Sequence, residues 1–70
     1  VAYAMLKAAN VKPTDLVYDL GAGDGKIAIA AAKNFGATAV GIEYNKEMAE
    51  LATRNTQRAG VADKVKIINY

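Results

Sequence analysis

The chain has 70 residues, of which 53% are hydrophobic and 23% charged, with nine Lys and Arg against seven Asp and Glu. This balance excludes intrinsic disorder, which needs low hydrophobicity and high net charge. The basic residues are interleaved with acidic ones, so no nucleic-acid or anionic-membrane surface is evident. The chain contains no Cys and no His, which excludes disulfide scaffolds, Cys/His metal sites and imidazole catalysis. No bilayer-length apolar run and no signal peptide is present, so we expect a cytoplasmic domain without a membrane partner.

The first half of the chain predicts helix, strand and helix in that order. A short helix is expected over residues 2–9, followed by a loop around the only proline, Pro13. Residues 16–20 are apolar and rich in strand formers, which is typical of a strand buried on both faces. Residues 21–25 hold three of the six glycines and predict a tight turn. A helix should follow over residues 26–35, ended by Gly36 in the left-handed conformation.

The second half predicts strand, helix and strand. Residues 39–43 form a second buried strand, and Asn45 is a good N-cap for a helix over residues 46–59. Asn55 falls on the inner face of that helix, where we expect it to pair with a loop backbone group. Residues 64–70 form a third strand. This order is that of an α/β fold: a Rossmann-like βαβαβ half of a doubly wound, mostly parallel sheet, with strand order 3-2-1 and a short helix in front.

The whole chain is expected to be a single partial domain. Residues 1–15 would be a leading helix and linker, and residues 16–70 the βαβαβ unit. The chain stops inside an apolar run, which predicts truncation after the third strand.

A glycine turn and an acid mark a ligand site at one edge of the predicted sheet. The turn, DLGAGDG at residues 19–25, lets a ligand touch the backbone and is followed by a helix start with free N–H groups. Glu43 ends the second strand, where an acid can accept both ribose hydroxyls of a nucleoside. The alternative is a plain tight turn, with Asp24 capping the helix and Glu43 in solvent.

The charges near the turn distinguish between nucleoside ligands. A dinucleotide fingerprint needs the spacing G-x-G-x-x-G, whereas this turn has G-x-G-x-G, with Lys26 where the third glycine would stand. Asp19 and Asp24 flank the turn and would repel a pyrophosphate at a few ångströms. They would attract the sulfonium and ammonium groups of S-adenosylmethionine. The charge pattern therefore favours S-adenosylmethionine over NAD or FAD.

Together, DLGAGDG and the following GIEYN at residues 41–45 resemble the first two motifs of class I, Rossmann-like S-adenosylmethionine-dependent methyltransferases. The stretch from Val17 to Asn45 looks closest to the protein-lysine methyltransferase-like branch. The resemblance implies that Asp19 approaches the methionine ammonium, and that the turn backbone contacts the methionine moiety. It also implies that Glu43 holds the ribose and that Tyr44 lies against the adenine. The cofactor-binding residues so implied are Asp19, Gly21, Ala22, Gly23, Glu43 and Tyr44.

The resemblance implies S-adenosyl-L-methionine as cofactor and leaves the acceptor open, a protein lysine being one candidate. No catalytic residue can be assigned, because the family's acceptor motif and its adenine-side acid would both follow Tyr70. We therefore expect the 70-residue chain alone to be inactive. Two alternatives stay open: an NAD- or FAD-binding fragment of an oxidoreductase, and a non-catalytic interaction module.

Overall fold

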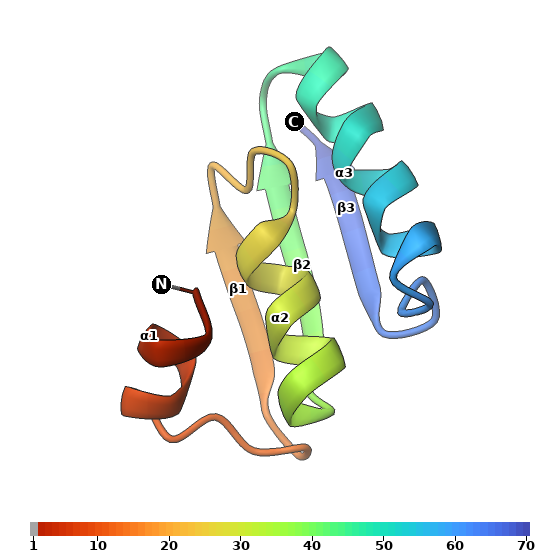
Figure 1. The fold of residues 1–70 in the computed structure, drawn as a ribbon. Helices are drawn as coiled ribbons and strands as arrows, with labels where there is room; N and C mark the ends of the chain where they lie inside the picture. Colours follow the sequence, from red (N-terminus) through yellow and green to blue (C-terminus); the bar gives the residue numbers. More distant parts are fainter. Residues whose placement is uncertain (1) are drawn as a thin grey trace.

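The computed structural model describes residues 2–70, which form three helices and one three-stranded parallel sheet (Figure 1). The strands lie in the order β1-β2-β3, which is the predicted order, and the element bounds differ from the predicted ones by at most one residue. Nothing among the described helices has the length and apolar character needed to cross a membrane. The elements are α1 (Ala2–Ala8), β1 (Leu16–Leu20), α2 (Lys26–Phe35), β2 (Thr38–Glu43), α3 (Lys46–Arg58) and β3 (Val65–Asn69).

Local signals set the helix ends as predicted. The side chain of Asn45 accepts the backbone N–H of Met48 at 3.1 Å and so caps the start of α3. Gly36 ends α2 at φ 71°, where its N–H reaches back to the carbonyls of the last turn. These caps position β2 between the two helices, with its carboxyl end directly before α3.

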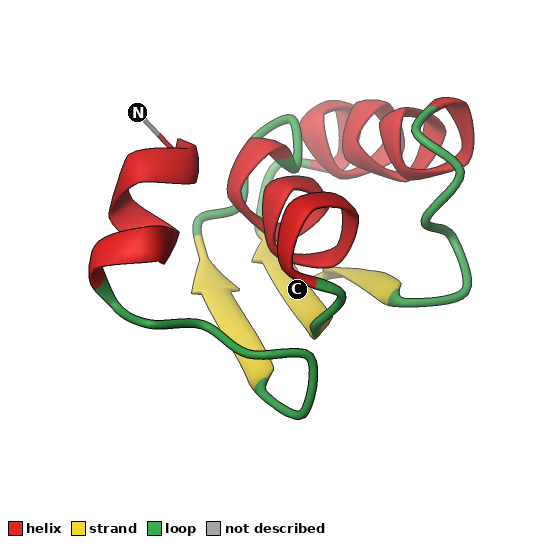
Figure 2. Cartoon of the chain, turned by 60° about the horizontal axis from the view of Figure 1, so that its bottom comes forward, coloured by secondary structure: helices red, strands yellow, loops and turns green. Residues whose placement is uncertain are grey.

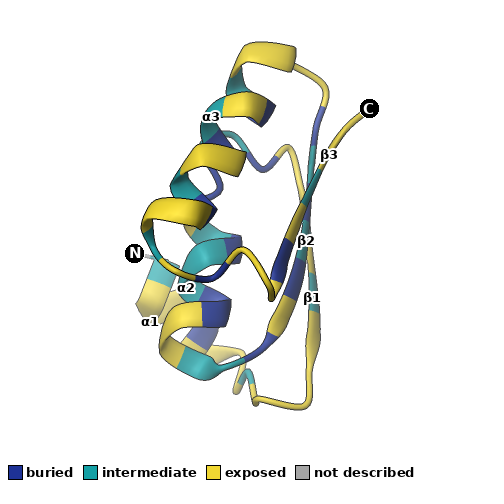
Figure 3. Cartoon of the chain, turned by 90° about the vertical axis from the view of Figure 1, so that its right-hand side faces the viewer, coloured by how far each residue is buried: buried dark blue, intermediate teal, exposed yellow. Residues whose placement is uncertain are grey.

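All three helices lie on one face of the sheet, and the other face is open (Figures 2 and 3). The prediction that the strands are buried on both faces is therefore wrong for this structure. Leu16, Tyr18 and Leu20 alternate along the outer side of β1, and Leu20 is 78% exposed. Burial on both sides requires a layer of helices on each face, and the described residues supply only one layer.

The core between the helices and the sheet consists mainly of alanine, which allows the layers to approach closely. The packing is tightest at Gly41, in the middle of β2. A Cβ there would lie 2.9 Å from the Cβ of Ala22 and 2.9 Å from the Cδ1 of Ile67. The glycine turn thus rests directly on the sheet. The buried core cluster comprises Leu6, Ala28, Ala31, Ala32, Ala37, Ala39, Val61 and Val65.

Candidate functional site

The glycine turn, residues 21–25, follows β1 and adopts a conformation that depends on its glycines. Gly21, Gly23 and Gly25 have φ of 70°, 58° and 87°. At Gly25 there are two reasons for glycine: the positive φ, and the Cβ of Ala52, which would lie 3.2 Å from an added Cβ. The G-x-G-x-G spacing therefore follows from a backbone that turns left-handed at every second residue.

The first N–H groups of the turn are already used within the chain. Gly21 and Ala22 both donate to the carbonyl of Ile42, at 2.8 and 3.0 Å. Gly23 donates to the Oε1 of Glu43 at 2.7 Å. Any contact of these three residues with a ligand would therefore come from their carbonyl oxygens or from their surface, since the donors are engaged.

The N–H groups at the start of α2 only partly meet the expectation that they are free: those of Ile27 and Ala28 have no hydrogen-bond partner among the described residues, whereas the two before them are engaged. Gly25 donates to the carbonyl of Ala22 at 3.0 Å, and Lys26 donates to the Oδ1 of Asp24 at 3.2 Å. The N-cap of α2 is Gly25, without a side-chain cap bond, so Asp24 does not cap the helix as the plain-turn alternative held; its short side chain only reaches the N–H two residues on. A phosphate at the end of the turn would have to displace these two bonds, so the free donors begin only at Ile27.

Glu43 lies against the glycine turn and is buried, with 5% of its surface exposed. Its Oε1 accepts from Gly23 at 2.7 Å, and its Oε2 accepts from the backbone N–H of Asn45 at 2.9 Å. The alternative in which Glu43 stands in solvent is therefore wrong. A carboxylate offers about four lone-pair sites, so two remain after these bonds, which is the number that two ribose hydroxyls require.

Asp19 is the second carboxylate near the carboxyl ends of β1 and β2. It lies on the helix side of β1, in register with Gly41 of β2, and is half-buried. Burial, and secondly the negative charge of Glu43, raise the pKa of Asp19 above its ordinary value. Both causes disfavour its charged form. A cation bound beside Asp19 would remove part of that cost.

A hollow of about 290 Å³ opens between the glycine turn and α1. Its size is close to the lower end of the roughly 300–1,000 Å³ range of small-molecule sites. Glu43 does not line this hollow, so the expected single concave site is only partly present: the turn separates Glu43 from it. The lining residues are Ala2, Met5, Asp19, Gly21, Ala22, Asp24, Lys26 and Ile27.

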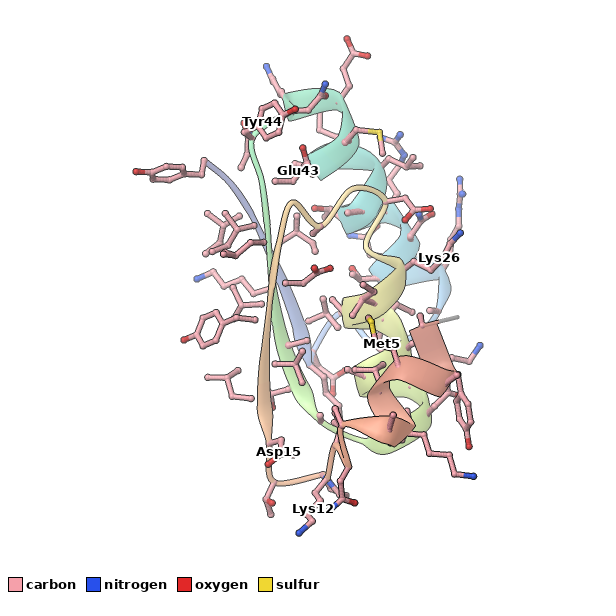
Figure 4. The ribbon with its side chains drawn as sticks, turned by 90° about the vertical axis from the view of Figure 1, so that its left-hand side faces the viewer. Met5, Lys12, Asp15, Lys26, Glu43 and Tyr44 are labelled. Carbon is pink, nitrogen blue, oxygen red and sulfur yellow. The ribbon has the colours of Figure 1, made fainter. Side chains whose placement is uncertain are left out.

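Tyr44 lies beside Glu43 at the same end of the molecule (Figure 4) and is 80% exposed. The predicted contact with adenine is untested, and an exposed ring there is accessible to a ligand. Asn69 was missed by the sequence analysis. Its side-chain amide donates to the carbonyls of Glu43 at 2.9 Å and Tyr44 at 3.2 Å, and its place at the carboxyl end of the third strand is the signal that could have found it.

A second, larger hollow of about 360 Å³ lies between α3 and β3. None of the predicted cofactor-binding residues lines it. Among the described residues there is also no group of three or more acidic side chains arranged to hold a metal ion. The predicted ligand-binding residues therefore gather at the glycine turn and not at this second hollow. The residues lining this second hollow are Lys46, Ala49, Glu50, Thr53, Ile67 and Asn69.

A glycine turn after the first strand and a buried acid after the second define a Rossmann-like nucleoside-binding unit. Residues 17–70 match the family described as "Methyltransferase domain", which covers more than half of the chain. The chain belongs to this methyltransferase domain family.

Individual relatives agree with this assignment. The chain is 45% identical over 69 residues to a protein-lysine N-methyltransferase of Saccharolobus islandicus, covering 97% of this chain and 43% of that protein. It is 36% identical over 58 residues to a ribosomal protein L11 methyltransferase of Pelotomaculum thermopropionicum, covering 83% and 19%. The crystal structure of an RNA methyltransferase from Salinibacter ruber, in complex with S-adenosyl-L-homocysteine, superposes with a TM-score of 0.97 at 45% identity, covering 99% and 45%. The chain thus spans less than half the length of each of these relatives.

Proposed function

We propose that this chain is the S-adenosylmethionine-binding part of a class I methyltransferase, a single partial domain whose remaining part completes the enzyme. The observation that carries the proposal is the glycine turn, which carboxylates flank and in which the N–H groups of Gly21, Ala22, Gly23 and Gly25 are bonded within the chain. A relative at 45% identity that was crystallised with S-adenosyl-L-homocysteine supports it.

The electrostatics of the turn support a cationic ligand over a pyrophosphate. Two unit charges 4 Å apart interact by about 4 kcal/mol at an effective dielectric constant of 20, whereas a typical net hydrogen bond contributes about 1 kcal/mol. Asp19 and Asp24 both line the hollow beside the turn, against the single cation Lys26. Charge therefore outweighs hydrogen bonding here, and it favours a sulfonium and an ammonium over two phosphates.

The proposed roles follow the position of each group. Asp19 would attract the methionine ammonium, with carbonyl oxygens of the turn as further acceptors. Glu43 would take the ribose hydroxyls with its two remaining lone-pair sites, and the exposed ring of Tyr44 would lie against the adenine. When bound, S-adenosylmethionine would supply an activated methyl group to an acceptor nucleophile. Positioning contributes much of the rate of such a transfer, and positioning the cofactor is the part assigned to this chain.

The acceptor is a separate question. The three relatives are named as methyltransferases of protein lysine, of ribosomal protein L11 and of RNA, although they share this unit. We propose a protein lysine as acceptor, on the resemblance of residues 17–45 to that branch and on the identity to the Saccharolobus protein.

Calorimetric titration of the protein with S-adenosylhomocysteine and, separately, with NAD tests the proposed cofactor. We expect saturable binding of S-adenosylhomocysteine at micromolar concentration and none of NAD at the same concentrations. Binding of NAD alone would favour the oxidoreductase alternative. Binding of neither by a folded protein would favour the interaction module.

A further inference from the structure

One face of α3 contacts the glycine turn along its length. The Cε of Met48 lies 3.8 Å from where a Cβ on Gly23 would be, and the Cβ of Ala52 lies 3.2 Å from the same position on Gly25. Positions 48, 52 and 55 are spaced by four and three residues, so they share one side of the helix. The third of them, Asn55, makes the polar contact on this face.

The side-chain amide of Asn55 donates to the backbone carbonyl of Asp24 at 3.0 Å, across 31 positions of sequence, in a partly buried setting. This carbonyl belongs to the peptide that joins Asp24 to Gly25, the residue with φ 87°. Asn55 therefore fixes the orientation of the peptide at which the turn enters α2.

The same helix is tied at its start to the acid of the site. Asn45, its N-cap, donates its backbone N–H to the Oε2 of Glu43 at 2.9 Å, while the Oε1 of Glu43 accepts from Gly23 at 2.7 Å. Besides the bonds of Gly21 and Ala22 to the carbonyl of Ile42, the later part of the turn is thus held by Glu43, next to the N-cap of α3, and by Asn55, about three turns further along the helix.

We infer that Asn55 is a positioning residue for the cofactor site: through the Asp24 carbonyl it holds the glycine turn in the conformation that binds the cofactor. This inference rests on the proposed function. It assigns to α3 a part in binding although Asn55 does not line the hollow beside the turn. Loss of the bond leaves the turn held only at its first three residues, by Ile42 and Glu43, so its end at Asp24 and Gly25 should open more often and the cofactor should bind more weakly.

Two variants test the bond, and a neighbouring residue supplies the control. Asn55→Ala removes the side chain, and Asn55→Asp keeps its size while replacing the donor with an acceptor. Thr56→Ala is the matched control, because Thr56 is buried and its hydroxyl donates to the carbonyl of Thr53 at 2.7 Å, entirely within α3. The control loses a hydrogen bond of the same helix without touching the turn.

The readouts are native-state amide hydrogen exchange and the dissociation constant of S-adenosylhomocysteine by calorimetry. We expect both Asn55 variants to exchange the N–H groups of Gly23 and Gly25 about tenfold faster than Thr56→Ala, and to bind about tenfold more weakly, as the loss of one hydrogen bond predicts. The amides of Val40 and Ile42 in β2 should change no more than in the control, because they report the stability of the whole fold.

Two results would overturn the inference: turn amides that exchange as in Thr56→Ala, or loosened turn amides with an unchanged dissociation constant. Failure of the proposed function looks different, because the unmodified protein would then not bind S-adenosylhomocysteine at all. The exchange measurement on the free protein shows in either case whether Asn55 holds the turn.

Discussion

Asp19 and Glu43 lie on neighbouring strands and face the same side of the sheet, yet their surroundings differ. Glu43 accepts two backbone N–H groups, which is the usual way for a protein to hold a buried carboxylate. Asp19 is half-buried beside that charge, and its pKa is raised by burial first and by Glu43 second. Glu43 therefore organises the backbone of the site, whereas the charge of Asp19 is costly to the fold and suited to a cation.

The substitution Asp19→Asn should raise the free energy of unfolding of the ligand-free protein at neutral pH. A raised pKa means that the folded state binds the proton more tightly than the unfolded state, so ionised Asp19 lowers the free energy of unfolding above its folded pKa. This cost disappears as the pH falls below the ordinary value of 3.8. In urea denaturation, the free energy of unfolding of Asp19→Asn should exceed that of the unmodified protein at pH 7. The difference between the two should shrink toward pH 4.

The exposed Asp63 provides the control, since Asp63→Asn should leave the free energy of unfolding nearly unchanged. A margin that grows on acidification would contradict the assignment of the raised pKa to Asp19. Asp19→Asn should also weaken S-adenosylmethionine binding, because the attraction of the Asp19 carboxylate for the ammonium is lost.

Removing the carboxylate of Glu43 should weaken cofactor binding most. Charge-assisted hydrogen bonds contribute about 1.5–3 kcal/mol, so Glu43→Ala should raise the dissociation constant of S-adenosylmethionine by roughly 10- to 100-fold. Glu47→Ala, at an exposed position in the first turn of α3, is the comparison. Calorimetry giving the same constant for Glu43→Ala as for Glu47→Ala would remove Glu43 from the site.

The helix ends and strands that depend on residues close in sequence could be predicted from the sequence. The N-cap at Asn45, the left-handed Gly36 and the strand before the glycine turn depend on neighbouring residues, and their positions are confirmed to within one residue. The expected pairing of Asn55 with a loop backbone group is also confirmed, although the sequence did not show which loop.

The parts that could not be predicted depend on contacts between distant segments. That the N–H groups of Gly21 and Ala22 converge on the carbonyl of Ile42 follows from the register of β1 on β2. The hydrogen bond from the side-chain amide of Asn69 to the backbone carbonyl of Glu43 likewise requires β3 to lie beside β2. Composition and spacing contain no information on such bonds, so the sequence did not predict which donors of the turn and of the helix start are engaged.

At the level of the elements, Gly41 should be intolerant of any side chain. An added Cβ would meet Ala22 and Ile67 at 2.9 Å each, and relieving both contacts requires the turn to lift from β2. Overpacking of this kind costs about 1–3 kcal/mol, so Gly41→Ala should lower the free energy of unfolding by that amount and weaken S-adenosylhomocysteine binding. A variant with an unchanged urea midpoint would contradict the close packing of turn and sheet.

The molecule as a whole has one covered and one open sheet face. The open face is lined by the apolar residues Leu16, Tyr18, Leu20, Val40, Ile42 and Ile68, with the exposed Lys66 of β3 beside Val40 as its charged member. Three of the apolar side chains are more than 50% exposed, and β1 forms an edge of the sheet. An uncovered apolar face next to an unpaired edge favours association with another chain.

We expect the isolated 70-residue chain to self-associate through this open face. Charged substitutions at its two most exposed positions, Tyr18→Glu with Leu20→Lys, should shift the chain toward a monomer in sedimentation velocity experiments. Lys12→Glu, in the loop between α1 and β1, should leave the distribution unchanged. Equal association of the double variant and the unmodified chain would show that the open face is not the contact.

The most direct measurement of the central claim, that the edge formed by β1 and β2 holds a cationic nucleoside cofactor, is a crystal structure of the protein with S-adenosylhomocysteine. We predict the ribose hydroxyls within hydrogen-bond distance of Glu43 and the ammonium beside Asp19 and the carbonyls of the glycine turn. A ligand bound in the hollow between α3 and β3, or one that places its ribose away from Glu43, would contradict the claim.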